Sequence, residues 1–193
     1  MQALRVEHST DLYQTLYEAY AEKHRHYHTQ KHIDAMLKHF DAVSDLAIQP
    51  AELELAIWFH DAVYKPLSKS NELESAQWAK QFLSSCNYDL EGQERVFKLI
   101  MATEHNGHIH SNDEKLVVDI DLTILGTPPD IYDVFEENVR KEYRLVPWFI
   151  YRKKRKEILK SFLNRPSIYQ TQYFIDKFEE TARVNISSTI AAL

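Results

Sequence analysis

The sequence predicts an all-α fold, a helical bundle of about eight or nine helices in a single domain spanning residues 1–193. Only 3 glycines and 6 prolines occur in 193 residues, which is too few for a turn-rich β-sandwich or a disordered chain. Hydrophobic residues make up 44% and charged residues 27%, as in a soluble globular protein with a substantial core. No repeat, low-complexity tract or linker divides the chain.

Charge, cysteine content and hydropathy limit the partners and the cellular location that we expect for this protein. The formal charge of −6 argues against a general nucleic-acid binder, although residues 151–156, YRKKRK, form a basic cluster typical of a solvated helix face. Cys86 is the single cysteine, which excludes an intrachain disulfide and a thiolate metal site and fits a reducing cytoplasm, where we expect the protein. The N-terminus lacks a signal-peptide pattern, and no apolar stretch approaches the roughly 18–20 residues that span a bilayer, so we expect no membrane partner.

The first two helices are predicted from apolar periodicity. One runs from Leu12 to about residue 24, with Leu12, Leu16, Tyr17 and Tyr20 on one face. Thr29 opens the next, whose apolar stripe contains Ile33, Met36, Leu37 and Phe40. His28 and His32 are four residues apart, and His32 directly precedes the first residue of this stripe. We therefore expect both histidines to point toward the core.

Residues 53–64, LELAIWFHDAVY, are nearly all apolar and predict a helix that begins at Pro50 and is broken at Pro66. A helix that is apolar around most of its circumference is normally central to its domain. This one carries the pair His60-Asp61 into the interior. Burial of adjacent polar groups is costly unless they find partners, and either a metal ion or a histidine–carboxylate hydrogen bond would provide one.

The rest of the chain predicts further helices and one histidine-rich loop. The helices are expected at residues 69–83, 94–103, 115–126, 131–143, 148–163 and 171–190. Residues 115–126, KLVVDIDLTILG, have the β-branched content of a strand, but we favour a helix because no partner strand is visible elsewhere. The loop TEHNGHIHSND holds three histidines, His105, His108 and His110.

The histidines and aspartates that interrupt these apolar segments are the candidate metal-binding and catalytic residues. They are His28, His32, His60, Asp61, the histidines of the loop, Asp119 and Asp121. Imidazole and carboxylate without thiolate suit a divalent ion such as Mn²⁺, Fe²⁺, Co²⁺, Zn²⁺, Ni²⁺ or Mg²⁺. Four ligands from three separate helices would leave positions open for water and substrate, and an aspartate can bridge two ions about 3.5–4 Å apart to support phosphate-ester hydrolysis.

In their order along the chain these residues resemble the HD superfamily of metal-dependent phosphohydrolases, helical bundles with the signature H…HD…D. The match assigns the metal ligands to His32, to the pair His60-Asp61 in FHDAVY, and to Asp121 in DIDLTILG. Asp121 is followed by Leu-Thr, which fits the family pattern better than Asp119, so Asp119 is expected to support or cap the site.

The stretch YHTQKHIDAM is also similar to a motif of cyclic-nucleotide phosphodiesterases, which share this core. In that branch the first histidine donates a proton to the leaving oxygen, which would make His28 the general acid. The combination RHYH…FHDAVY…NELESA…ATEH…DIDLTILG…VRKEY…ARVN looks like a bacterial subgroup of predicted HD-type phosphohydrolases and covers most of the chain.

Four further positions are candidates. The resemblance implies roles for two of them, His105 and Glu72, and side-chain chemistry suggests roles for the other two, Lys65 and Arg140. His105, with His108 or His110, would hold a second metal, whereas the alternative is a solvated loop with incidental histidines. Glu72 would lie near the metal-bound water or would serve as a surface or cap residue. Two cations, Lys65 and Arg140, would bind substrate phosphate or simply coat a helix.

Taken together, the expected function is metal-dependent hydrolysis of a phosphate ester in a small phosphorylated metabolite, with a nucleotide the first candidate. One or two divalent ions would be the cofactor, and a homodimer is an open option. Two alternatives use the same residues. One is a di-iron HD-type oxygenase, and the other is a non-catalytic nucleotide-sensing module.

Overall fold

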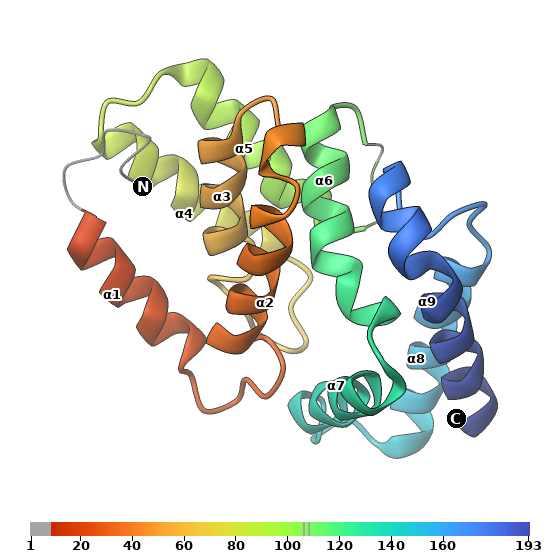
Figure 1. Ribbon diagram of the computed structural model, residues 1–193. Coiled ribbons are helices and arrows are strands. Elements are labelled where there is room, and N and C mark those ends of the chain that lie inside the picture. Colours follow the sequence, from red (N-terminus) through yellow and green to blue (C-terminus); the bar gives the residue numbers. More distant parts are fainter. Residues whose placement is uncertain (1–8, 106, 108) are drawn as a thin grey trace. The chain divides into compact units, whose positions relative to one another are not determined.

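The computed structural model describes residues 9–105, 107 and 109–193, and among them it contains helices and connections but no strand. The predicted all-α class is therefore confirmed, with nine α-helices in the described part of the chain (Figure 1). In order, the helices are α1 (Ser9–Tyr20), α2 (Gln30–Asp41), α3 (Pro50–Phe59), α4 (Asn71–Ser85), α5 (Leu90–Ala102), α6 (Asn112–Asp121), α7 (Pro129–Glu142), α8 (Trp148–Leu163) and α9 (Gln172–Ala192), with short 3₁₀ segments η2 (Ser44–Leu46) and η3 (Leu122–Gly126).

Contacts within the chain separate two compact units, residues 1–120 and 121–193, and each is described by itself. The expectation that residues 1–193 form a single domain stays a prediction. The boundary falls at the last residue of α6, and the other nine residues of this helix belong to the first unit. We therefore describe Asp121 with α6.

Helix α3 is the centre of the first unit. It contacts α2, α4 and α5 (Figure 1). Its buried residues lie around most of its circumference, and they are Glu52, Leu53, Leu55, Ala56, Ile57 and Phe59. The apolar segment recognised in the sequence thus occupies the interior of its unit, as expected for a helix without a polar face.

The helix ends earlier than its sequence predicts, because α3 stops at Phe59 and residues 60–64 form a turn. Side chains from other segments bind the backbone of this turn and replace the helical hydrogen bonds. Arg25 donates to the carbonyl oxygens of Asp61 and Ala62, at 2.6 and 3.0 Å. The backbone N–H of Val63 donates to Ser75 Oγ at 3.0 Å. The prediction of a helix through Tyr64 is therefore wrong, for a reason that lies outside the segment itself.

A capping network fixes the start of α6 against the start of α3. Ser111 Oγ accepts the backbone N–H of Glu114 at 3.1 Å, and the Glu114 carboxylate accepts the N–H of His110 at 2.7 Å. The Asp113 carboxylate accepts the N–H groups of Ile48 and Gln49, both at 2.8 Å. These contacts place α6, which confirms the predicted helix as far as Asp121, after which the chain continues as η3.

Buried Glu52 ties α3 to α5. Its carboxylate accepts hydrogen bonds from Tyr88 Oη at 2.8 Å and from the guanidinium of Arg95 at 2.7 and 2.8 Å. Burial and the hydrogen bond to Glu52 raise the pKa of Tyr88 to about 12. Gly92 lies inside α5 rather than before it, and a Cβ there would collide with the Tyr88 ring and approach Glu52 Oε1 to 2.9 Å. The glycine is thus required by this close approach.

The second unit is held together by polar contacts to the backbone of η3. Tyr169 Oη donates to the Leu122 carbonyl at 3.0 Å. The Asn185 amide donates to the carbonyl oxygens of Leu125 and Thr127, both at 2.9 Å. Because 3₁₀ segments leave carbonyl groups without helical partners, these side chains let η3 pack against α9.

Glu179 on α9 provides a stability prediction for the second unit. Burial alone would raise its pKa, but hydrogen bonds from the backbone N–H groups of Ile168 and Tyr169, and from Arg183 and Ser167, outweigh burial and lower the pKa. We expect Glu179→Gln to reduce the free energy of unfolding by about 2 kcal/mol near neutral pH. Because the folded-state pKa is lowered, the difference should shrink as pH falls through that pKa, and urea unfolding at several pH values measures it. If Glu179→Gln lowered the free energy of unfolding equally at all pH values, the stabilisation would not come from the charged form of Glu179.

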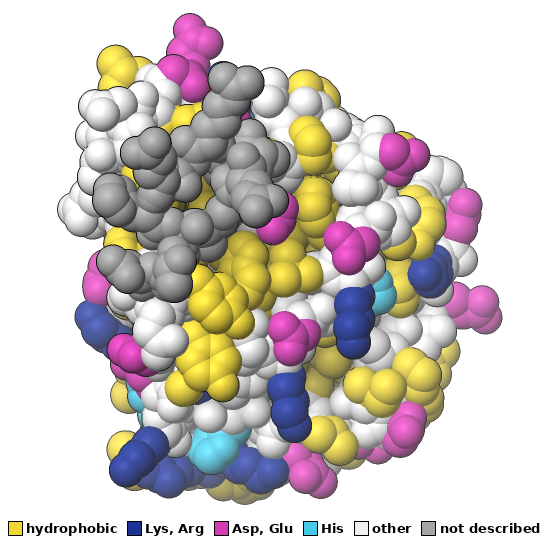
Figure 2. Space-filling view, turned by 60° about the vertical axis from the view of Figure 1, so that its left-hand side comes forward, with side chains coloured by type: hydrophobic (Ala, Val, Ile, Leu, Met, Phe, Trp, Pro, Cys, Tyr) yellow, Lys and Arg dark blue, Asp and Glu magenta, His cyan; other side chains and the backbone are white. Residues whose placement is uncertain are grey.

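The side of the first unit that carries α1 is shown in Figure 2, where acidic and basic side chains are scattered among hydrophobic ones rather than segregated by sign. Two exposed aromatic residues of α1, Tyr13 and Tyr17, stack with ring centroids 6.3 Å apart. In the described part of the chain, every helix is too short or too polar to cross a bilayer.

Candidate metal centre

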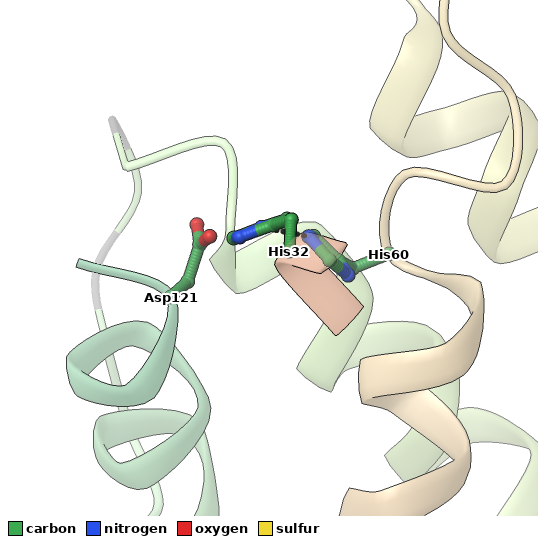
Figure 3. Close-up of side chains that lie close together, drawn as sticks. All are labelled: His32, His60 and Asp121. Carbon is green, nitrogen blue, oxygen red and sulfur yellow. Dashed lines mark hydrogen bonds between the residues drawn. The ribbon is translucent and has the colours of Figure 1, made fainter. Parts of the chain in front are cut away.

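Three side chains that are remote in the sequence converge in the structure. His32 is on α2, His60 follows the last residue of α3, and Asp121 ends α6. One ligand atom from each of the three lies within 4.8 Å of the other two, and both histidines are buried (Figure 3). Figure 3 shows the Asp121 carboxylate turned toward the histidine rings. The structure thus brings Asp121 into this group, whereas Asp119 is fully buried and outside it.

The hydrogen bonds of the rings determine which atoms can bind a cation. His60 Nδ1 lies 2.8 Å from the carbonyl oxygen of Ile57, which can only accept, so Nδ1 carries the proton. In neutral His60 the Nε2 atom therefore carries a lone pair that can accept a hydrogen bond or bind a metal ion. It faces His32 Nε2 at 3.2 Å and the Asp61 Oδ2 atom at 3.1 Å. A proton on one of these atoms or a metal ion between them would make these contacts favourable.

The donor set fits a divalent metal. Two ligand nitrogens about 2.1 Å from a shared ion lie about 3.0–3.4 Å apart at angles between octahedral and tetrahedral, and the observed 3.2 Å falls in this range. His32 Nδ1 lies 3.1 Å from Tyr27 Oη, a hydroxyl that can accept from Nδ1–H when Nε2 is a ligand. Nitrogen and carboxylate oxygen without sulfur suit Mn²⁺, Fe²⁺, Co²⁺, Ni²⁺, Zn²⁺ or Mg²⁺.

Asp61 links this group to His28. Its Oδ2 atom lies 3.9 Å from His28 Nε2, and the two side chains are 13% and 21% exposed. His28 lies before α2 rather than on it, and its ring stacks on Tyr64 at a centroid distance of 4.2 Å. His28 is therefore the more accessible of the histidines in contact with Asp61, which a group that exchanges protons with a ligand requires.

Arg25 is the residue that the sequence did not single out. Its side chain is fully buried, and it donates to the carbonyl oxygens of Asp61 and Ala62 and, at 3.4 Å, of His28. Its guanidinium also lies over the Tyr64 ring at 5.5 Å. One cation thus joins the segment before α2 to the His60-Asp61 turn. A buried arginine that binds carbonyl groups leaves no pattern in a sequence, because its partners are backbone atoms.

The start of α4 holds the other end of the same turn. The side-chain amide of Asn71 accepts a hydrogen bond from the backbone N–H of Lys65 at 3.0 Å and donates one to the Lys65 carbonyl oxygen at 3.1 Å. His24 Nε2 lies 2.7 Å from the Tyr64 carbonyl oxygen. Asn71 is thus the first residue of α4 and a clamp on the loop after His60-Asp61, whereas Ser70 is at the N-cap position.

Glu72 lies near the centre, within electrostatic reach of Asp61. Burial is the main cause that raises its pKa, and the negative charges of Asp61 and Glu104 act in the same direction. Its own backbone N–H and His105 partly oppose the rise. A carboxyl group whose pKa is raised can exchange protons closer to neutral pH than an ordinary glutamate does.

The histidines of the 105–110 loop have separate positions. His105 adopts a left-handed backbone conformation with φ of 59° and lies close enough to Glu72 to affect its pKa. His110 is exposed at the start of the α6 cap, and His108 lies outside the described residues. In the described part of the chain, the group whose ligand atoms converge comprises His32, His60 and Asp121, without His105.

The two cations expected to bind phosphate are engaged elsewhere. Lys65 is 64% exposed and forms an ion pair with Glu74 at 2.8 Å. Arg140, in the second unit, donates to the carbonyl oxygens of Tyr143 and Val146, at 2.6 and 3.1 Å. These contacts give both residues structural partners, and a role in substrate binding stays a prediction.

Comparisons with protein-family models, with curated proteins and with solved structures find no significant match to this chain.

Proposed function

We propose that the chain is a metal-dependent phosphohydrolase that acts on a small phosphorylated metabolite, with a nucleotide as the expected class. The observation that carries the proposal is the convergence of His32, His60 and Asp121 from three separate segments, with ligand atoms within 4.8 Å of one another. The resemblance of the ordered residues to the HD superfamily supports the same reaction.

In this proposal His32, His60, Asp61 and Asp121 would hold the ion. A bound divalent ion lowers the pKa of a coordinated water toward neutrality and neutralises charge on phosphoryl oxygens. The Arg25 clamp and the Asn71 contacts hold the turn so that Asp61 and His60 keep their positions. Ligand side chains that are already held in place lose less conformational entropy when the ion binds, which favours binding.

His28 and Glu72 are assigned the proton transfers. His28, 21% exposed and in contact with Asp61, holds a proton on Nε2 for the leaving oxygen. Glu72, whose pKa is raised, accepts a proton from the attacking water. His105 is assigned to a second ion or to the substrate.

The test is a panel of phosphate monoesters, diesters and nucleotides, assayed with the purified protein after chelation and after addition of Mn²⁺, Co²⁺, Fe²⁺ or Mg²⁺. We expect release of phosphate or of a nucleotide product that depends on added metal. Inactivity with every ester and every metal, in protein that binds the metal, would overturn the assignment. Turnover that requires Fe²⁺ and oxygen would favour the di-iron oxygenase instead.

A further inference from the structure

The turn after α7 and the first residues of α8 expose a group of large apolar side chains in the second unit. Leu145 is 86% exposed, Phe149 69%, Trp148 51% and Ile150 43%. We call these four residues the apolar tip. Single exposed apolar residues are normal on protein surfaces, but four within six positions concentrate apolar surface in one short segment, as binding sites do.

Arg140 holds the tip in place. Its guanidinium donates to the carbonyl oxygens of Tyr143 and Val146, and it lies over the rings of Tyr151 and Trp148 at 4.7 and 5.7 Å. The Trp148 ring stacks on buried Tyr151 at a centroid distance of 5.9 Å. The turn is therefore fixed by contacts within its own unit, and the outward position of Leu145 and Phe149 follows from that fixed turn.

A row of cations continues from the tip along α8. The row consists of Arg152, Lys153, Lys156 and Lys160, which we call the cationic stripe. The stripe residues follow Phe149 by 3, 4, 7 and 11 positions, which places them on one side of the helix. Arg155 instead pairs with Glu136 at 2.6 Å beside buried Tyr151 and Leu159. In residues 144–160, seven Lys and Arg accompany one acidic residue, Glu157.

We propose that the apolar tip and the cationic stripe dock on an anionic lipid surface. Aromatic and aliphatic side chains that enter the headgroup region, beside lysine and arginine at the level of the phosphates, are the pattern of an interfacial helix. Charge complementarity supports this occupant. Residues 121–193 contain 12 Lys and Arg against 10 Asp and Glu, a net charge of +2 in a chain of −6. A single-stranded nucleic acid would use the cations, but Leu145 and Ile150 would gain nothing from it.

This inference changes the expectation of no membrane partner, which rested on the lack of a spanning segment. Docking at an interface needs no spanning helix, so it is compatible with the lack of such a helix among the described residues. The apolar tip and the cationic stripe share no residue with the proposed metal site.

The experiment is flotation of the full chain with phosphatidylcholine vesicles, with and without phosphatidylserine, at low and high salt. We expect binding that requires phosphatidylserine and weakens with salt. Two variants separate the contributions. Arg152→Glu with Lys153→Glu should weaken binding roughly tenfold or more. Leu145→Ser with Phe149→Ser should do the same through lost apolar burial.

Matched controls lie on exposed positions of the first unit. Lys38→Glu with Lys98→Glu makes the same charge change, and Leu90→Ser removes an equally exposed leucine, which is 79% exposed. Both controls should bind as the unaltered chain does. Absence of flotation, or equal loss in control and tip variants, would overturn the proposal. A second contradicting result would come from the molar mass in solution. If the unaltered chain does not bind vesicles but is a dimer, and the variant with Leu145→Ser and Phe149→Ser is a monomer, then a second copy of the chain covers the tip.

Discussion

Asp61→Ala is expected to reduce metal-dependent hydrolysis of the best phosphate ester by at least about a hundredfold, because loss of a proposed ligand should cost no less than loss of a residue that supports a ligand, which costs about 10- to 100-fold. Asp61 Oδ2 lies 3.1 Å from His60 Nε2 and 3.9 Å from His28 Nε2. The substitution would therefore remove a proposed ligand and the side chain that lies between the proposed general acid and His60. Initial rates at saturating Mn²⁺, with metal affinity measured by calorimetry, quantify both losses.

The matched control is Asp34→Ala, an exposed aspartate on α2, the helix that carries His32. It should leave the rate and the metal affinity little changed. Thermal melting monitored by circular dichroism establishes that both variants fold. Unaltered turnover in folded Asp61→Ala would remove Asp61, and with it the proposed chemistry, from this site.

Arg25→Ala is expected to lower the free energy of unfolding by about 3 kcal/mol, because it leaves the carbonyl groups of Asp61 and Ala62 buried without their donor. Metal affinity should fall by about ten- to a hundredfold, since the turn that carries His60 and Asp61 loses its support. Chemical unfolding of the metal-free protein and metal titration measure the two effects.

Arg25→Lys separates the geometry of the guanidinium from its charge. A lysine keeps the charge but has one compact ammonium group in place of a planar fork, so it should recover only part of the stability. Lys23→Ala, an exposed cation two residues away, should have little effect. Full recovery by lysine would show that charge, rather than the bonds to three separate carbonyl groups, determines the role of Arg25.

The fold class and the convergent residues were predictable because they depend on patterns within short segments. The apolar circumference of residues 50–59 predicts a central helix, and the period of residues 29–40 places His32 on the face that packs against it. Asp121 was preferred over Asp119 on its neighbours in the sequence, and the structure brings Asp121 to the two histidines.

The remaining features depend on contacts between segments. The end of α3 at Phe59 is caused by Arg25, Asn71 and Ser75, which bind the backbone of the next residues from other parts of the chain. The position of Gly92 inside α5 reflects the close approach of Tyr88 and Glu52. No local pattern encodes such contacts, so a sequence alone misplaces these boundaries.

The measurement that tests the central claim most directly is an anomalous difference map from crystals soaked in Mn²⁺. The account predicts a peak within bonding distance of His32 Nε2, His60 Nε2 and carboxylate oxygens of Asp61 and Asp121. A map without a peak at these atoms, in crystals that bind Mn²⁺ elsewhere or not at all, would contradict it.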